Sequence, residues 1–287
     1  MRGVAGACLL VLPLLTLAAC SPRPEGRGSG VVSLNPCTDA LLVELGDPAQ
    51  IAALSSYSST PGQSSLPLTV ARRFPSTRGT MEEVLAARPS VVVSGGFTPP
   101  ATAQAYRRMG VRLVELGIAS TVEESDAQIR QMAALLGHRQ RGEALIARIH
   151  TALAQAAPPA GQAAVPTLVW HGGGLVSGPH TLISDVMARV GLAPLSATKG
   201  LSQAQYLPLE AVVADPPALV LAVAHSGQGT DGRRSGARAI SHPVLDRLPH
   251  TRRAELDPSL EYCGGPTIIA LAQRLAQIRQ DLPQEHP

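Results

Sequence analysis

Aromatic side chains are scarce in this chain: its 287 residues include four Tyr, two Phe and one Trp, together 2% of the chain. Lysine is scarcer still, since Lys199 is the only one. A protein that reads nucleic acid usually concentrates its basic residues and places aromatics among them. Here the formal net charge is +3 and the arginines are scattered in ones and twos, so we expect no nucleic-acid partner.

Long hydrophobic runs are also rare. The clearest one spans residues 4–17, after the basic Arg2. It is shorter than the roughly 20 apolar residues that a bilayer-spanning helix needs, and it is typical of a signal peptide, which we place at residues 1–19. The cleavage zone Leu17-Ala18-Ala19-Cys20 is similar to the lipobox of bacterial lipoproteins. We therefore expect Cys20 to carry a lipid anchor; the alternative is ordinary cleavage, with Cys20 incidental. Residues 20–30 are rich in Pro, Gly, Ser and Arg and predict a flexible tether.

Cysteine is the third rare residue, with four copies. Cys8 would leave with the signal peptide and Cys20 would be lipidated, so Cys37 and Cys263 remain. Each lies in a tight loop before an expected helix, in an exported protein where a disulfide is permitted. Three alternatives stay open for the pair: a disulfide, a contact with ligand or metal, or inert packed thiols. The second rests on the helix N-terminus, which lowers a thiol pKa and can receive an anion.

Short apolar strands alternate with helices in both halves of the chain, which indicates an α/β fold with parallel sheets. The expected strands are residues 31–34, 51–54, 91–93, 111–116, 165–170 and 218–223. The expected helices are residues 40–45, 81–87, 100–109, 182–190, 209–214 and 266–282. Thr38 or Asp39 could cap the first of these helices, and residues 55–80 are expected to form a loop.

A stretch without strands separates the two halves. Thr121 and Glu124 fit a capping box for a helix over residues 121–136, and a second helix is expected over residues 139–156. At about 1.5 Å per residue the second helix is roughly 25 Å long, which is enough to bridge two lobes.

Two segments on either side of this helix match each other. Residues 81–92 read MEEVLAARPSVV and residues 209–220 read LEAVVADPPALV. In each segment a glutamate, Glu82 or Glu210, precedes a proline by seven residues, with a helical stripe between them and a buried strand after. A duplicated lobe explains the match. The alternative is that any helix–proline–strand unit looks like this.

Several segments of the chain, together with the two Glu…Pro units and the long helix, match the pattern of a known family. These segments are Val31-Val32-Ser33-Leu34-Asn35-Pro36, residues 51–57 (IAALSSY) and Arg78-Gly79-Thr80-Met81-Glu82. The chain resembles the substrate-binding proteins of ABC importers for cobalamin and iron–siderophore chelates. The resemblance implies two Rossmann-like α/β lobes, residues 31–138 and 158–287, joined by one long backbone helix over residues 139–157. The ligand would bind in the cleft between the lobes.

The same resemblance implies a non-enzymatic capture protein in the periplasm or cell envelope, held at the membrane through Cys20 only. Its ligand would be a metal chelate, a corrinoid first and a ferric siderophore second. Its partners would be an ABC permease and the ATPase subunits of that importer, with no cofactor and no resident metal, and the protein would be a monomer. Glu82 and Glu210 would dock onto arginines of the permease. The simpler alternative is the usual preference for acidic residues in the first turn of a helix.

The expected cleft residues follow strands or precede helices, because ligands of α/β lobes meet the loops at the carboxyl ends of strands. The aromatic candidates are Tyr57, Phe97, Trp170, Tyr206 and Tyr262, whose flat rings suit a macrocycle. The other candidates are Cys37, Arg78, His171 and Cys263. Arginines also cluster in loops and could bind anionic groups or remain solvated: Arg72, Arg73 and Arg78, and Arg233, Arg234 and Arg238. Burial in the core is the alternative for the aromatics, above all for Trp170.

Two enzymatic or metal-binding alternatives remain. The sequence His171-Gly172-Gly173-Gly174 imitates the oxyanion loop of some esterases, but a Gly-x-Ser-x-Gly elbow is missing, and the nearest match, around Ser202, lacks its last glycine. A zinc-binding protein or metallohydrolase is the other alternative, because the chain has eight histidines. They are spread singly, without the spacing of zinc ligands.

Overall fold

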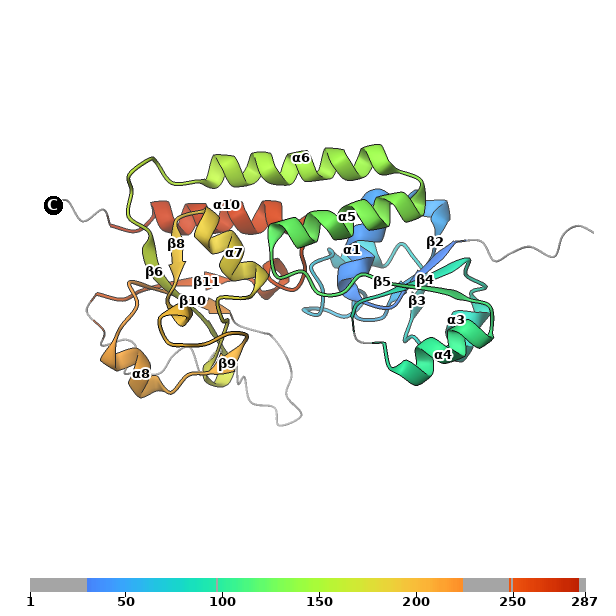
Figure 1. Cartoon of the computed structure of the whole chain (residues 1–287), viewed down its shortest axis with the longest axis horizontal. Helices are drawn as coiled ribbons and strands as arrows, with labels where there is room; N and C mark the ends of the chain where they lie inside the picture. The colour runs from blue at the N-terminus through green and yellow to red at the C-terminus, as the bar shows by residue number, and fades with distance from the viewer. Residues whose placement is uncertain (1–29, 97, 224–247, 249, 284–287) are drawn as a thin grey trace, which may run out of the picture.

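The chain forms two α/β lobes side by side, described here from a computed structural model for residues 30–96, 98–223, 248 and 250–283 (Figure 1). The first lobe holds a five-stranded sheet in the order β3-β2-β1-β4-β5, in which every pairing is parallel. Its strands are β1 (Val31–Ser33), β2 (Ile51–Ser55), β3 (Ser76–Thr77), β4 (Val91–Ser94) and β5 (Arg112–Glu115). The α/β class is confirmed, and the sheet of the first lobe is parallel as expected.

The second lobe holds a six-stranded sheet in the order β11-β10-β6-β7-β9, with β8 paired to β6. Its strands are β6 (Val165–His171), β7 (Leu175–Val176), β8 (Leu192–Pro194), β9 (Gln205–Tyr206), β10 (Leu219–Val223) and β11 (Arg252–Leu256). The pairs β6–β7 and β7–β9 are antiparallel, so this sheet is not wholly parallel. β7 follows the glycine-rich turn after β6, whereas β9 comes after β8, and the alternation of strands and helices in the sequence reveals neither of these two short strands.

The two lobes repeat one strand arrangement. In the first, β1 pairs with β2 and β4, and β4 pairs with β5; in the second, β6 pairs with β8 and β10, and β10 pairs with β11. The matched segments found in the sequence occupy equivalent places, because α3 (Met81–Ala86) precedes β4 and α8 (Leu209–Ala214) precedes β10. This correspondence supports a duplicated lobe.

Helices cover both faces of each sheet. The first lobe has α1 (Pro36–Leu45) and α5 (Val122–Leu136) on one face and α3 and α4 (Pro100–Arg108) on the other (Figure 1). In the second lobe α7 (Leu182–Arg189) and α10 (Thr267–Gln280) lie on the face shared with α5, and α8 lies on the opposite face. Side chains alternate accordingly: Val91 and Val93 of β4 join one core cluster, and Val92 joins another.

The helix α6 (Arg139–Ala156) runs across the top of both lobes and packs on α5 and on α10 (Figure 1). Its buried side chains Leu145, Ile149 and Leu153 belong to a core cluster that also contains Leu42 of the first lobe. The same cluster continues into the second lobe, with Leu275 and others. Because this hydrophobic core is continuous beneath α6, the helix is packed against both lobes and connects them rigidly, unlike a flexible linker.

The start of α1 differs from the expectation. Asn35 is the N-cap, since its side chain accepts a hydrogen bond from the backbone N–H of Cys37, and Pro36 occupies the first turn. Neither Thr38 nor Asp39 is the cap, so that prediction was wrong. Proline fits the first helical turn because it needs no donor there. As a result Asp39 lies inside the helix, where it is fully buried. The expected loop over residues 55–80 also contains a short helix, α2 (Leu68–Ala71), and the strand β3.

Candidate functional site

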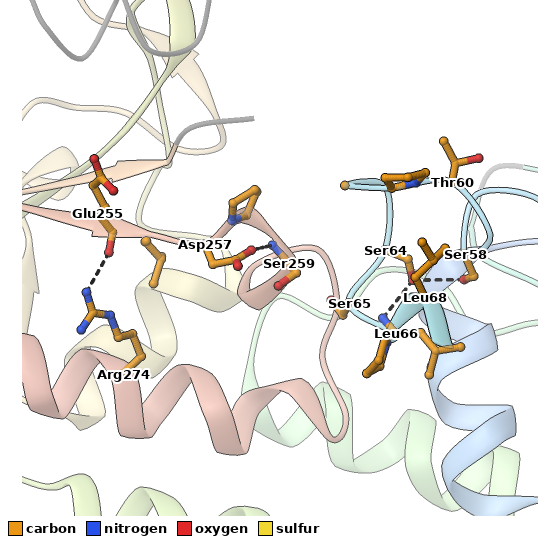
Figure 2. A pocket seen from close by; sticks show the side chains of 15 residues that line it. Ser58, Thr60, Ser64, Ser65, Leu66, Leu68, Glu255, Asp257, Ser259 and Arg274 are labelled. Atoms are coloured by element: carbon orange, nitrogen blue, oxygen red, sulfur yellow. Dashed lines mark hydrogen bonds between the residues drawn. The ribbon is translucent and has the colours of Figure 1, made fainter. Parts of the chain in front are cut away.

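A cavity of about 740 Å³ lies between the lobes, with one wall from each (Figure 2). The first wall is the segment after β2, residues 58–68, where hydroxyl side chains gather. The second wall is the end of β11 and the turn after it, residues 255–259, together with Arg274 of α10. The carboxyl ends of β2 and β11 both lead into these walls, which is where α/β lobes place their ligands.

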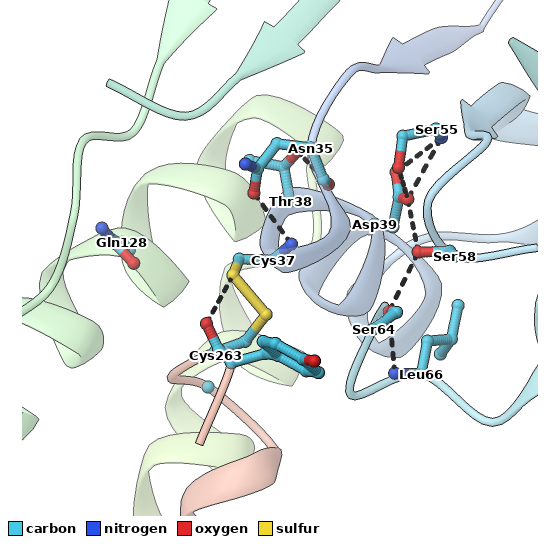
Figure 3. Close-up of a disulfide and its surroundings, with 12 residues drawn as sticks. Asn35, Cys37, Thr38, Asp39, Ser55, Ser58, Ser64, Leu66, Gln128 and Cys263 are labelled. Atoms are coloured by element: carbon cyan, nitrogen blue, oxygen red, sulfur yellow. Dashed lines mark hydrogen bonds between the residues drawn. A yellow bond between two sulfur atoms is a disulfide. The ribbon is translucent and has the colours of Figure 1, made fainter. Parts of the chain in front are cut away.

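A disulfide bond joins the two lobes next to this cavity. Cys37, at the start of α1, and Cys263, just before α10, form a disulfide with a Cα–Cα distance of 5.0 Å and a sequence separation of 226 residues (Figure 3). Of the three alternatives from the sequence, the structure has the disulfide. The Cys37 sulfur also lies 3.1 Å from the carbonyl oxygen of Tyr262, as a contact only, because a disulfide sulfur carries no proton. The bond ties the two lobes together beside the cavity.

Further contacts join the lobes on either side of the disulfide. The hydroxyl of Tyr262 donates a 2.7 Å hydrogen bond to the carbonyl of Gly62, a residue of the cavity wall. The backbone N–H of Gly265 donates to Ser125 at 2.8 Å. Gly265 has φ +64°, and a Cβ there would come within 2.7 Å of Leu41. Glycine is therefore required at this position, where the chain before α10 passes Leu41 of α1.

A buried carboxylate holds the first wall in place. Asp39 accepts hydrogen bonds from the backbone N–H of Ser55 at 3.1 Å and from the hydroxyls of Ser55 and Ser58 at 2.6 Å each (Figure 3). Burial raises the pKa of Asp39 to about 6, and the hydrogen bonds from serine side chains act in the opposite direction. The exposed Tyr57 lies between Ser55 and Ser58, so this carboxylate also fixes the segment that carries Tyr57.

A hydroxyl–imidazole–carboxyl chain stands at the end of β6. His171 Nε2 lies 2.9 Å from the hydroxyl of Ser177, and His171 Nδ1 lies 3.3 Å from Glu261 Oε1. Such a chain can support nucleophilic catalysis, but Ser177 is buried, and burial raises the pKa of Glu261 to about 8, so that its carboxyl is largely neutral at pH 7. A triad needs an exposed nucleophile and an ionised orienting carboxylate. The geometry therefore favours a structural link between β6 and the turn before α10.

Trp170 and Tyr206 come together, although away from the inter-lobe cavity. Trp170 is 4% exposed and packs with Leu168 and Val212 in the core beneath α8, so it occupies the buried position that the sequence left as its alternative. Tyr206 is 75% exposed on β9. Both line a second cavity, of about 420 Å³, at the base of α8. The period of two along β6 explains the placement, since Trp170 faces the α8 side and Val169 the α10 side.

The two candidate docking glutamates sit on equivalent helices at the lower side of the molecule in Figure 1. Glu82 is in the first turn of α3 and Glu210 in the first turn of α8, and both are exposed. Arg78 is exposed and pairs with Glu83 at 2.8 Å. The backbone and side-chain hydrogen bonds from Arg78 lower the pKa of Glu83. Arg78 is thus committed to the base of α3 and does not line the inter-lobe cavity.

The inter-lobe cavity is therefore lined by none of the described residues chosen from the sequence. Tyr57 directly precedes the wall residue Ser58, and Tyr262 donates a hydrogen bond to the wall residue Gly62, but both tyrosines, Cys37 and Cys263 lie outside the lining itself. Phe97, Cys20 and the second arginine cluster lie outside the described residues. The polar residues that line the cavity were missed: Ser58, Thr60, Ser64, Asp257, Ser259 and Arg274. For all of them except Arg274, which lies on α10, the only sequence signal is a position after a strand, which many loop serines share.

The described part of the chain gives no support to two other kinds of site. Within it no three His, Cys, Asp or Glu side chains gather as a metal site would require. Within the same residues no helix combines the length and apolar character of a membrane span.

Comparisons with known proteins agree with this architecture. The structure resembles a periplasmic heme binding protein from Pseudomonas aeruginosa with a TM-score of 0.69 and 23% identity, covering 87% of this chain and 92% of that one. It resembles the periplasmic heme binding protein HutB of Vibrio cholerae with a TM-score of 0.69 and 20% identity, covering 88% and 99%. For the periplasmic vitamin B12 binding protein BtuF of Vibrio cholerae the TM-score is 0.64 with 15% identity, covering 89% and 99%.

At these identities the likeness shows the fold alone. A search of curated proteins gives no match. The model of the family described as periplasmic binding protein matches residues 31–249, more than half of the chain. The duplicated α/β lobes, the bridging helix α6 and this match agree, and the chain belongs to the periplasmic binding protein family.

Proposed function

We propose that this protein is the substrate-binding component of an ABC importer and captures a metal chelate between its lobes. The observation that carries the proposal is the cavity of about 740 Å³, whose two walls come from different lobes. A ligand there would contact residues 58–68 and residues 255–259 together. Structural relatives are described as binding heme or vitamin B12, and the volume of this cavity lies in the range of about 300–1,000 Å³ that is usual for small-molecule sites. Among chelates we put a corrinoid first and a ferric siderophore second.

Delivery would use the tips of the two lobes. Glu82 and Glu210 are exposed and lie in the first turns of α3 and α8, which hold equivalent places in the repeat and lie on the same side of the molecule (Figure 1). Two separated carboxylates of this kind suit a membrane permease that presents an arginine to each lobe. A lipid anchor on Cys20, followed by the tether, would keep the protein close to that permease. We expect a monomer, because one chain supplies both walls of the cavity.

The test is a binding titration of the mature chain from residue 21 with cyanocobalamin, a ferric hydroxamate and heme, followed by calorimetry and by thermal unfolding. A ligand present at 100 times its dissociation constant should stabilise the protein by about 2.7 kcal/mol. Thr60→Arg should weaken binding, because Thr60 is exposed in the cavity wall. Met109→Arg adds the same charge at an exposed site outside the cavity and should bind normally. Failure of all three chelates to bind would refute the proposal.

A further inference from the structure

The second lobe has another cavity, on the edge of its sheet that lies away from the inter-lobe cavity. Its volume is about 580 Å³, and its lining includes Val165 and Pro166 at the start of β6, Ala218 just before β10 and Arg252 at the start of β11. These three strands are parallel, so their amino ends share one edge, whereas the carboxyl end of β11 leads into the inter-lobe cavity. We call it the amino-edge cavity. The helices α6 and α10 end on this side of the molecule, at the left in Figure 1.

The titratable side chains of the amino-edge cavity are all basic. His250, Arg252 and Arg279 line it, and no Asp or Glu is among its described lining residues. Arg252 is exposed, and within the described part of the chain its guanidinium forms no hydrogen bond or ion pair. Two arginines thus place two positive charges at the cavity with no carboxylate in its described lining to balance them, and such a cavity attracts anions.

Arg279 is the buried member of this group, with only 6% of its surface exposed. Its Nη1 donates hydrogen bonds to the carbonyl oxygens of Ala156, at 3.3 Å, and of Val190, at 2.5 Å, where α6 and α7 end. Helix C-termini carry partial negative charge, so this contact explains how a guanidinium is held there. It uses one nitrogen only. Nε and Nη2 bond to no described residue and are not enclosed, so these donors are open to a ligand in the cavity that Arg279 lines.

A purely structural role for Arg279 leaves part of the site unexplained. The two helix ends offset only part of the charge of Arg279, and Arg252 bonds to neither of them. A buried guanidinium without a carboxylate partner is costly, because its charge has left water without full compensation. An anion in the cavity would supply that compensation and would also give Arg252 a partner.

The rest of the described lining is mostly apolar. Gln162 is its one uncharged polar side chain, and alanines, prolines, Val165 and Leu282 make up the remainder. Cavities of about 300–1,000 Å³ usually hold small organic molecules against apolar walls, with a few polar groups that orient them. A ligand that fills this cavity should therefore have an apolar body as well as an anionic group.

We infer that the amino-edge cavity binds a small amphiphilic carboxylate, whose anionic group contacts Arg252 and Arg279 and whose apolar part lies against Val165 and Leu282. Arginine binds a carboxylate through charge-assisted hydrogen bonds, which are roughly twice as strong as neutral ones, so a neutral amide of the same shape should bind less well. The site is separate from the inter-lobe cavity, and the inference does not depend on the proposed function. It gives the protein a second ligand site of different chemistry.

The test is a calorimetric titration of the mature chain from residue 21, at pH 7.5 and low salt, with three probes. Sodium octanoate should bind at least tenfold more tightly than octanamide, which lacks the charge, and than inorganic phosphate, which lacks the apolar body. Equal binding of either control probe would overturn the inference. Glu285→Gln is titrated as well, because an acidic side chain close to the C-terminus could compete for the cavity. Failure of octanoate to bind both proteins would also overturn the inference.

Substitutions of the two arginines locate the octanoate. Arg252→Gln should weaken octanoate binding at least fivefold and leave octanamide binding unchanged, and it should fold normally because the guanidinium has no partner among the described residues. The matched control is Arg112→Gln: Arg112 is exposed and begins the edge strand β5 of the first lobe, as Arg252 begins the edge strand β11 of the second. Wild-type affinity in Arg252→Gln, or an equal loss in Arg112→Gln, would overturn the inference. Arg279→Met should abolish octanoate binding; if it does not fold, Arg252→Gln decides alone.

Discussion

Removing the disulfide between Cys37 and Cys263 should destabilise the protein by several kcal/mol. The bond closes a loop across a sequence separation of 226 residues, almost the whole mature chain. The chain-entropy relation gives about 5 kcal/mol for a loop of that length, and typical measured values are about 2–4 kcal/mol. We therefore expect Cys37→Ser to lower the free energy of unfolding by about 2–5 kcal/mol.

The assay is urea unfolding of the mature chain from residue 21, which lacks Cys20. Trp170 is the only tryptophan and lies in the core of the second lobe, so its fluorescence reports unfolding of that lobe. Far-UV circular dichroism reports both lobes. The two signals should change together, because the hydrophobic core is continuous from one lobe to the other beneath α6.

The single variants make the test specific. Cys37→Ser, Cys263→Ser and the double variant should lose the same free energy of unfolding, because each breaks the same bond. Wild-type protein in dithiothreitol should match them. A loss below about 1 kcal/mol, or losses that add up in the double variant, would refute the reasoning, since they would show two independent packed side chains.

Three further predictions follow from buried and exposed groups. Burial raises the pKa of Asp39 to about 6 and of Glu261 to about 8, so the native state holds protons that the unfolded chain has released. The free energy of unfolding should therefore fall as the pH rises from about 4 to 8, by roughly 3 kcal/mol for Asp39 alone. Urea unfolding at a series of pH values should show a shallower fall in Glu261→Gln than in the wild type. An unchanged dependence on pH in this variant would contradict the reasoning. Glu82→Ala and Glu210→Ala should leave the affinity for the chelate unchanged and weaken transport in cells, most in the double variant; loss of binding in the purified singles would place them in the site instead. Trp170→Ala should cost about 3–5 kcal/mol of stability, as a core truncation does, whereas Trp170→Phe should keep chelate affinity within about twofold by calorimetry.

The fold could be predicted from local patterns because each lobe repeats one unit. The Glu…Pro segments fall on α3–β4 and α8–β10, and the strand-free stretch gives α5 and α6 with bounds close to those expected. The patterns fail where strands are very short. β7 and β9 have two residues each and pair antiparallel after a turn in which Gly173 and Gly174 have positive φ. Two residues are too few to show a period.

The candidate site was harder to predict, for a physical reason. Large aromatics such as Trp170 can line a cleft or pack in a core. The alternation along β6 places Trp170 on one face of the sheet, but whether that face is buried depends on the helices that cover it. The inter-lobe cavity is lined instead by hydroxyls and carboxylates such as Thr60 and Asp257, which look like ordinary loop residues. Asp39 was expected to be a helix cap but is buried inside α1, because Asn35 caps this helix and Pro36 begins it one turn earlier than expected.

Hydrogen exchange with and without cyanocobalamin tests the central claim most directly, because it reports both lobes in one experiment. The mature protein would be compared empty and saturated, with occupancy followed by the absorbance of the corrin. The account predicts increased protection in residues 58–68 and in residues 255–259 at the same time, since each supplies one wall of the cavity. Protection confined to one lobe, or to the region of Trp170 and Tyr206 at the base of α8, would contradict a ligand held between the lobes.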